Sequence, residues 1–172
     1  MTQVYAVGYD AKDATTSPDI EDVVTKIAGA TINIGSLVAA STADTGGQTV
    51  IECTSTLATA QLMEGVYTGV GGTGAIATAT QVTNGLSGRA AATGDVIRIV
   101  KRGIAKMRFA AAVLTSAVTF GTVKLAPHGT TAGWAQEATA GSPIIGNLWQ
   151  TLTGGGTTTG TEVIITAKVN FR

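Results

Sequence analysis

The sequence predicts an all-β protein, a small barrel or sandwich, and three observations lead to this fold class. The chain is rich in Thr, Val, Gly and Ala, and among its 172 residues there are 23 Gly but only 3 Pro. Such a composition suits strands and tight turns better than helices. Short alternating segments separated by Gly also recur at intervals of roughly 8–12 residues, which is typical of sandwiches and barrels rather than of βαβ units.

The first seventeen residues are expected to form an extended arm outside the core. Val4–Val7 can form a short strand, but residues 8–17 are polar and rich in turn-forming types. The core domain is therefore expected to span residues 18–172, with a division near residue 88 as an alternative.

Residues 18–28 favour one short helix. Ser17 is a suitable cap, Pro18 stands at the first helical position and acidic residues fill the first turn. Apolar residues follow at helical spacing, namely Ile20, Val23, Val24 and Ile27. A strand remains the alternative, because Val23-Val24-Thr25 is β-branched at every position.

From Gly35 onward the patterns indicate strands, with Leu57–Met63 as a candidate single helical turn. The separators include Gly-Gly, Asn-Gly, Thr-Gly-Asp and Arg-Gly, which are suited to turns. The expected strands are Leu37–Ala40, Thr49–Thr54, Leu62–Val70, Ala75–Val82, Asp95–Val100, Ile104–Ala110, Val118–Phe120, Val123–Ala126, Ala132–Ala135, Ile144–Leu148 and Glu162–Phe171.

Charge is unevenly distributed although the formal net charge is zero. Residues 1–88 hold eight acids and two bases, a net charge of −6, whereas residues 89–172 hold nine bases and three acids, a net charge of +6. Such a chain can match itself across copies, acidic end against basic end. Neutralisation within one monomer is the equally weighted alternative. Nucleic-acid binding is disfavoured, because no aromatic residues interleave with the bases and no binding motif accompanies them.

The residue types that usually carry chemistry are scarce. Cys53 and His128 are the only residues of their kinds, so the sequence predicts no disulfide framework, no metal site and no cofactor. We expect Cys53 to be a buried small hydrophobe in a strand and His128 to be a turn residue after Pro127. No Gly-x-Ser-x-Gly motif is present, and we expect no enzymatic activity.

The sequence lacks two signals that would direct a protein out of the cytoplasm or into a membrane. No secretory signal and no run of eighteen apolar residues is visible, so we expect synthesis in a cytoplasm and no membrane partner.

The segment Gly69–Gly74 fits the pattern Gly-x-Gly-x-x-Gly, and Asp95 follows at a distance suited to a ribose-binding acid. A dinucleotide site, however, needs a helix immediately after the glycines, because the helix N-terminus holds the pyrophosphate. Ala75–Thr80 alternates as a strand instead. We therefore interpret the segment as a β-loop.

Two basic segments and two tryptophans are candidates for contact surfaces. Alternation places Arg98 beside Val96 and Val100 on one face, and Lys106 beside Arg108 on another. Trp134 and Trp149 lie near turns, where an aromatic residue serves as a core anchor or as an interface plug. The candidate interface residues are Val4, Tyr5, Val7 and Tyr9 in the arm, with Arg98, Arg102, Lys106 and Trp134 in the core domain.

The C-terminal half resembles the capsid decoration (cement) proteins of bacteriophages. The resemblance is in the order of Gly121–Leu125, Gly129–Trp134, Ser142–Leu148 and Glu162–Val169, and the step Ala92–Ile97 followed by Arg102–Ala105 is similar to one in the family. Gly35–Val38 and Glu64–Val70 are similar to its earlier strands. These motifs are β-turn signatures and none is catalytic.

This resemblance implies a structural virion protein that binds the major capsid protein on the outer surface of an icosahedral phage head. In such families the protein is usually a homotrimer that staples adjacent capsomers, and an N-terminal arm often reaches the shell or a neighbour. The longer N-terminal region, the helix expected at Asp19–Ala28 and the Gly/Thr-rich stretch Thr153–Thr161 depart from the pattern, so the resemblance does not define the mode of docking. A phage tail or fibre component, and a ligand-binding β-domain, are the alternatives.

Overall fold

The computed structural model describes residues 22–54, 62–110, 123–150 and 162–171, and within these ranges the chain is almost entirely β. The expected all-β class is confirmed. The strands are β1 (Asp22–Ala28), β2 (Leu37–Ala40), β3 (Thr49–Glu52), β4 (Met63–Tyr67), β5 (Val96–Ala110), β6 (Lys124–Pro127), β7 (Ala135–Glu137), β8 (Gly146–Leu148) and β9 (Glu162–Asn170), with one short helix, α3 (Ala79–Thr83).

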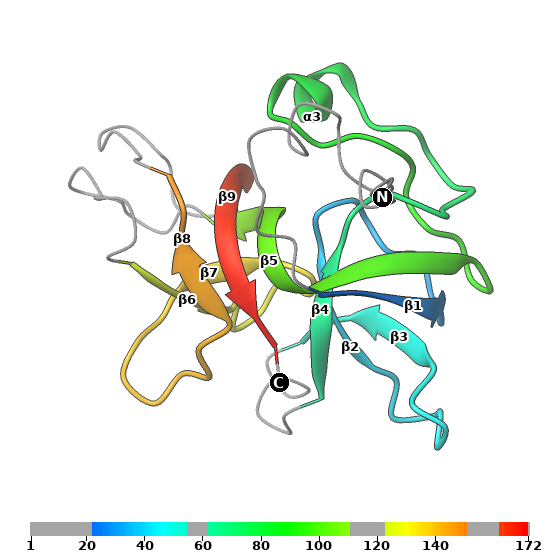
Figure 1. Cartoon of the computed structure of the whole chain (residues 1–172), viewed down its shortest axis with the longest axis horizontal. Coiled ribbons are helices and arrows are strands. Elements are labelled where there is room, and N and C mark those ends of the chain that lie inside the picture. The colour runs from blue at the N-terminus through cyan, green and yellow to red at the C-terminus, as the bar shows by residue number, and fades with distance from the viewer. Residues whose placement is uncertain (1–21, 55–61, 111–122, 151–161, 172) are drawn as a thin grey trace, which may run out of the picture.

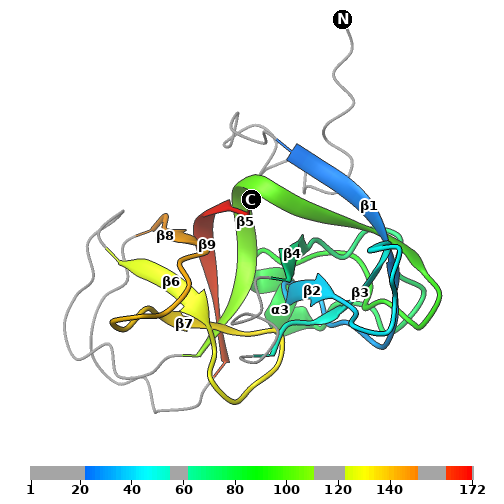
Figure 2. The ribbon, with the colours of Figure 1, turned by 90° about the horizontal axis from the view of Figure 1, so that it is seen from below.

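The strands form two closed rings that share β5 (Figure 1). The N-terminal ring runs β1-β3-β2-β4-β5 and closes through antiparallel pairing of β1 with β5. The C-terminal ring runs β5-β7-β6-β8-β9 and closes through pairing of β5 with β9 over Arg102–Ala110. Seen from below, β1 lies along the first half of β5, while β6 to β9 gather around its second half (Figure 2). Ring closure leaves few free strand edges.

The long strand β5 replaces two strands and a turn that the sequence predicts. The Arg102-Gly103 pair is not a turn but a bend within one strand of 15 residues. Gly103 has φ +121°, a conformation that glycine adopts readily, and the pairing of β1 with β5 shifts register beside it, from Asp22↔Arg102 to Val23↔Val100. The bend lets one strand pass from the first ring to the second.

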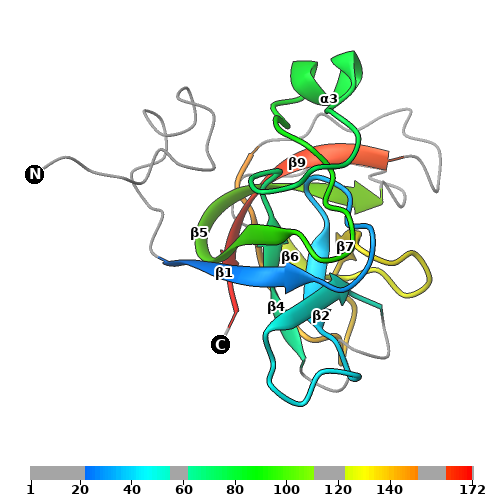
Figure 3. The ribbon, with the colours of Figure 1, turned by 90° about the vertical axis from the view of Figure 1, so that its right-hand side faces the viewer.

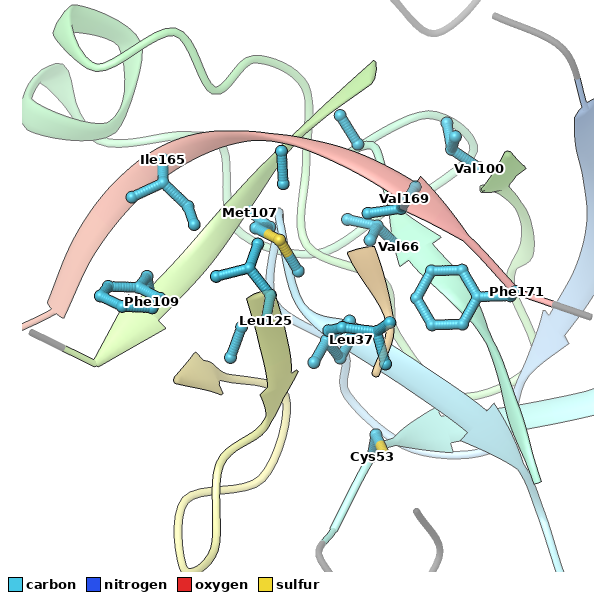
Figure 4. Close-up of a cluster of buried hydrophobic side chains, with 14 of the residues drawn as sticks. Leu37, Cys53, Val66, Val100, Met107, Phe109, Leu125, Ile165, Val169 and Phe171 are labelled. Atoms are coloured by element: carbon cyan, nitrogen blue, oxygen red, sulfur yellow. The ribbon is translucent and has the colours of Figure 1, made fainter. Parts of the chain in front are cut away.

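Two apolar clusters form the core, and alternation divides the side chains between them. On β2, Leu37 and Ala39 belong to the larger cluster whereas Val38 belongs to the smaller one. The smaller cluster fills the N-terminal ring. The larger cluster, shown in Figure 4, fills the C-terminal ring and continues across the contact between the rings. Because β2 is covered on both faces, it is a continuous apolar run rather than an alternating one.

The prediction of a helix over residues 18–28 is wrong for Asp22–Ala28, because these residues form strand β1. Residues 18–21 lie outside the described residues. The alternative, a strand favoured by β-branched residues, is confirmed. Six residue pairs join β1 to β5, and this pairing outweighs the helical spacing of a few apolar residues. Val24 packs against the smaller cluster, whereas Val23 and Ile27 face outward.

The strand expected over Ala75–Val82 is also wrong. Ile76 makes only an isolated bridge to Arg89, and α3 follows it. The Thr78 side chain accepts a hydrogen bond from the Gln81 N–H, and the Gln81 side chain accepts one from the Thr78 N–H, which forms a capping box. None of the helix residues is buried, and α3 stands away from the strands (Figure 3).

Several expected strands occur close to their predicted bounds, among them Leu37–Ala40 and the closing strand. The arm at residues 1–17, most of the helical turn at Leu57–Met63 and the strand at Val118–Phe120 lie outside the described residues. Met63, at the end of that turn, begins β4 instead. The division near residue 88 stays a prediction.

Candidate interaction surface

The glycine-rich loop and Asp95 meet in the structure, where the Asp95 carboxylate binds the loop. The Asp95 carboxylate accepts hydrogen bonds from the backbone N–H of Thr73 and of Ala92, each at 2.7 Å, and from the Thr73 hydroxyl. These bonds favour the ionised form and lower the pKa of Asp95. A Cβ on Gly71 would lie 2.1 Å from the Val96 carbonyl oxygen, so this loop needs glycine for close backbone approach.

His128 orders a turn, as the sequence predicts. Its Nδ1 accepts hydrogen bonds from the N–H groups of Thr130 and Thr131, at 3.2 and 2.9 Å. The expected burial of Cys53 is confirmed, and burial raises the pKa of its thiol to about 11, but Cys53 lies one residue after the end of β3 rather than in a strand. No group of three or more His, Cys, Asp or Glu residues that could hold a metal ion occurs in the described ranges. Within the same ranges, no helix is long and apolar enough to cross a membrane.

Of the predicted interface residues, three lie on β5 and face different parts of the surface. Arg98 lies on the N-terminal ring, opposite Thr25 of β1, and Arg102 is exposed where the rings meet. Lys106 lies on the C-terminal ring, opposite Thr166 of β9. The structure therefore does not gather these three into one patch. Val4, Tyr5, Val7 and Tyr9 lie outside the described residues.

Trp134 belongs to a small cluster on the C-terminal ring. The Arg108 guanidinium lies 5.2 Å from the centroid of the Trp134 ring, and the His128 ring packs edge-on against it with the two ring centroids 6.4 Å apart. Arg108 also forms a two-point ion pair with Glu162 of β9, at 2.7 and 2.9 Å. Trp134 is half-buried by these contacts, so part of its ring remains at the surface.

In the N-terminal ring, two lysines on neighbouring strands share one carboxylate. Glu64 lies between Lys26 of β1 and Lys101 of β5, with N–O distances of 3.3 and 3.6 Å. A β-bulge places it there, since the pairing steps from Val38↔Gly65 to Ala39↔Met63 and leaves Glu64 without a partner on β2. Lys26 also donates a hydrogen bond to the Gly47 carbonyl at 2.7 Å.

The C-terminal ring differs, because three of its lysines face outward in neighbouring positions. Lys168 on β9 is opposite Asn147 on β8, and Asn147 is opposite Lys124 on β6. Lys106 on β5 lies one diagonal step from Lys168. We call the outer surface formed by Lys106, Lys124, Asn147, Thr166 and Lys168 the basic face. Sequence analysis identified Lys106 but missed Lys124 and Lys168, although alternation along the closing strand places Thr166 and Lys168 on one side.

The structure also refines the uneven charge seen in the sequence. Residues 22–102, which include the whole N-terminal ring, hold five acids and five bases and are neutral. Residues 1–21 hold four acids and one base, a net charge of −3, and residues 103–172 hold five bases and two acids, a net charge of +3. The opposite charges thus belong to the segment before β1 and to the part of the chain that builds the C-terminal ring.

Comparisons with known proteins show no family for this chain and give distant structural neighbours. No protein-family model matches the sequence, and no curated protein matches it. Among solved structures, the head fiber gp8.5 N base of bacteriophage phi29 matches with a TM-score of 0.38 and 13% sequence identity, covering 87% of this chain and 93% of that chain. At that TM-score the likeness carries no argument about fold or function.

Proposed function

We propose that this chain is a structural virion protein that decorates the outer surface of an icosahedral phage head and staples neighbouring capsomers. One observation carries the proposal: the chain separates opposite charges, with the acidic excess in residues 1–21 and the basic excess in residues 103–172. Separated, complementary charges serve contacts between macromolecules. The resemblance of Gly121–Leu125, Ser142–Leu148 and Glu162–Val169 to phage decoration proteins suggests the kind of assembly.

The two-ring body suits this role. The two rings are joined by the strand β5, which belongs to both of them, rather than by a linker. A decoration protein binds at many equivalent sites and gains strength from several simultaneous contacts, which a body with fixed surfaces can offer. We infer that the partners are the major capsid protein and further copies of this chain, as a homotrimer. No catalytic step, cofactor or nucleic acid enters the proposal.

The candidate contact residues have separate roles in this proposal. Val4, Tyr5, Val7 and Tyr9 of the arm contact the shell or a neighbouring copy. Arg98 lies on the N-terminal ring and Arg102 where the rings meet, whereas Lys106 and Trp134 both lie on the C-terminal ring, so the first two contact other neighbours than the last two.

Deletion of residues 1–17 tests the role of the arm. The truncated chain should keep the circular-dichroism spectrum of the full chain but should no longer sediment with purified phage heads. The full chain at the same concentration is the control, and an exposed variant such as Val82→Ala should bind as the full chain does. Binding of the truncated chain at full occupancy would refute the arm contact.

A further inference from the structure

The three lysines of the basic face keep their ammonium groups out of ion pairs within the described part of the chain. Among the residues that the structure describes, neither Lys106, Lys124 nor Lys168 forms an ion pair. Lys106 donates a hydrogen bond to the Thr166 hydroxyl at 2.8 Å, and the Lys168 ammonium lies 5.2 Å from the centroid of the Trp149 ring. Glu162, which lies on this side of the β5–β9 pair, is already bound to Arg108.

The spacing of these lysines concentrates positive charge. Lys168 and Lys124 are two strands apart in the register, which corresponds to about 10 Å between their backbones. That distance is close to the Debye length at 0.1 M salt, so the two charges act together on an approaching group. The face therefore favours a partner with several negative charges at similar spacing.

The segment that precedes β1 has matching chemistry. Residues 1–21 contain Asp10, Asp13, Asp19 and Glu21 against Lys12. Fully extended, 21 residues reach up to roughly 70 Å. The segment is joined to Asp22, the first residue of β1, and this reach is long enough for it to contact another molecule.

We propose that the acidic residues 1–21 of one copy bind the basic face on the C-terminal ring of a second copy. Such a contact joins two different surfaces, and it forms a closed ring of subunits when the rotation between copies closes. The inference rests on the multi-copy assembly proposed above and names the contact that holds the copies together. Because the contact is electrostatic, raising NaCl from 50 to 500 mM should weaken self-association by roughly tenfold or more.

A charge-swap experiment on the full chain tests this contact. One variant carries Asp10→Lys, Asp13→Lys and Asp19→Lys, and the other carries Lys106→Glu, Lys124→Glu and Lys168→Glu. In sedimentation velocity the unmodified chain should form oligomers, and each variant alone should be monomeric. An equimolar mixture should form a complex, because each segment then meets a face of opposite charge on the other chain.

Two further variants keep the test decisive. Lys124→Glu with Lys168→Glu leaves the Lys106–Thr166 hydrogen bond intact and should still abolish self-association. Arg89→Glu changes an exposed charge outside the basic face and should leave self-association unchanged.

A mixture that stays monomeric would overturn the proposal, since the segment would then lie on its own chain or on another partner. Oligomers that survive both charge reversals would also overturn it. No phage head is present in this experiment, so its failure is distinguishable from failure of the proposed decoration role.

Discussion

The two rings are built alike but treat their charges differently. In the N-terminal ring, Lys26 and Lys101 share Glu64, and the carboxylates of Asp44, Glu52 and Asp95 accept hydrogen bonds from loop groups. In the C-terminal ring, Lys106, Lys124 and Lys168 face outward without an ion pair in the described part of the chain. The Arg108–Glu162 ion pair serves internal order in the second ring as well, so the difference lies in these three lysines, which in our proposal serve contact.

Phe109→Ala should have the largest effect on stability. Phe109 lies in the larger apolar cluster on the second half of β5, and its loss should lower the free energy of unfolding by about 3–5 kcal/mol. Because β5 belongs to both rings, the variant should unfold in one transition rather than lose the C-terminal ring alone. Val82→Ala is the exposed control and should change stability by less than about 0.5 kcal/mol. Two separate thermal transitions in calorimetry would contradict the shared-strand account.

Two glycines with the same backbone angle form a matched pair in the N-terminal ring. Gly71 and Gly94 both have φ +91°. A Cβ on Gly71 would meet the Val96 carbonyl oxygen at 2.1 Å, whereas one on Gly94 would meet nothing within 4 Å. Gly94→Ala should cost about 1 kcal/mol for the backbone angle alone, and Gly71→Ala clearly more. Equal losses of stability in urea unfolding would show that the loop does not pack on β5 as described.

Glu64→Gln should destabilise the N-terminal ring, because it leaves Lys26 and Lys101 close together without a carboxylate. The loss should be about 1–3 kcal/mol, as for other half-buried charged contacts. Glu137→Gln on the C-terminal ring is the matched control, since Glu137 is exposed at the end of β7 and should contribute less than about 0.5 kcal/mol. Equal effects of the two substitutions in urea unfolding would remove the contrast between the rings.

Asp95→Asn should have a smaller, pH-dependent effect. The pKa of Asp95 is lowered in the folded protein, so its carboxylate stabilises the fold above its unfolded pKa of about 3.9. This stabilisation is lost as the pH falls through the folded pKa. The thermal midpoint of the variant should therefore lie below that of the unmodified chain at pH 7, and the difference should vanish in strong acid. A difference that is the same at pH 7 and pH 2 would contradict the role of the charge.

Sequence patterns predicted the strands in which buried and exposed residues alternate. They failed where local helix signals point to one structure and pairing with a distant strand imposes another. Glu162–Asn170 alternates because one side is buried, and its prediction is correct within a residue or two. Helix-start signals precede Asp22–Ala28, but the partner of this segment on β5 lies 69 to 80 residues away, which no local pattern reveals. The helix α3 could have been found, because Thr78 and Gln81 have the spacing of a capping box.

The candidate surface was only partly predictable for the same reason. Alternation placed Lys106 and Arg108 together, and β5 confirms this. The row from Lys168 through Asn147 to Lys124 depends on the register of three strands that are distant in sequence. Its existence therefore could not be derived from spacing alone.

The most direct test of the proposed role is to image purified phage particles in which this chain carries a label, and to count its copies per particle. The account predicts hundreds of copies spread over the outer surface of the head. A label confined to the tail or to a few fibres, or absent from the particle, would contradict it.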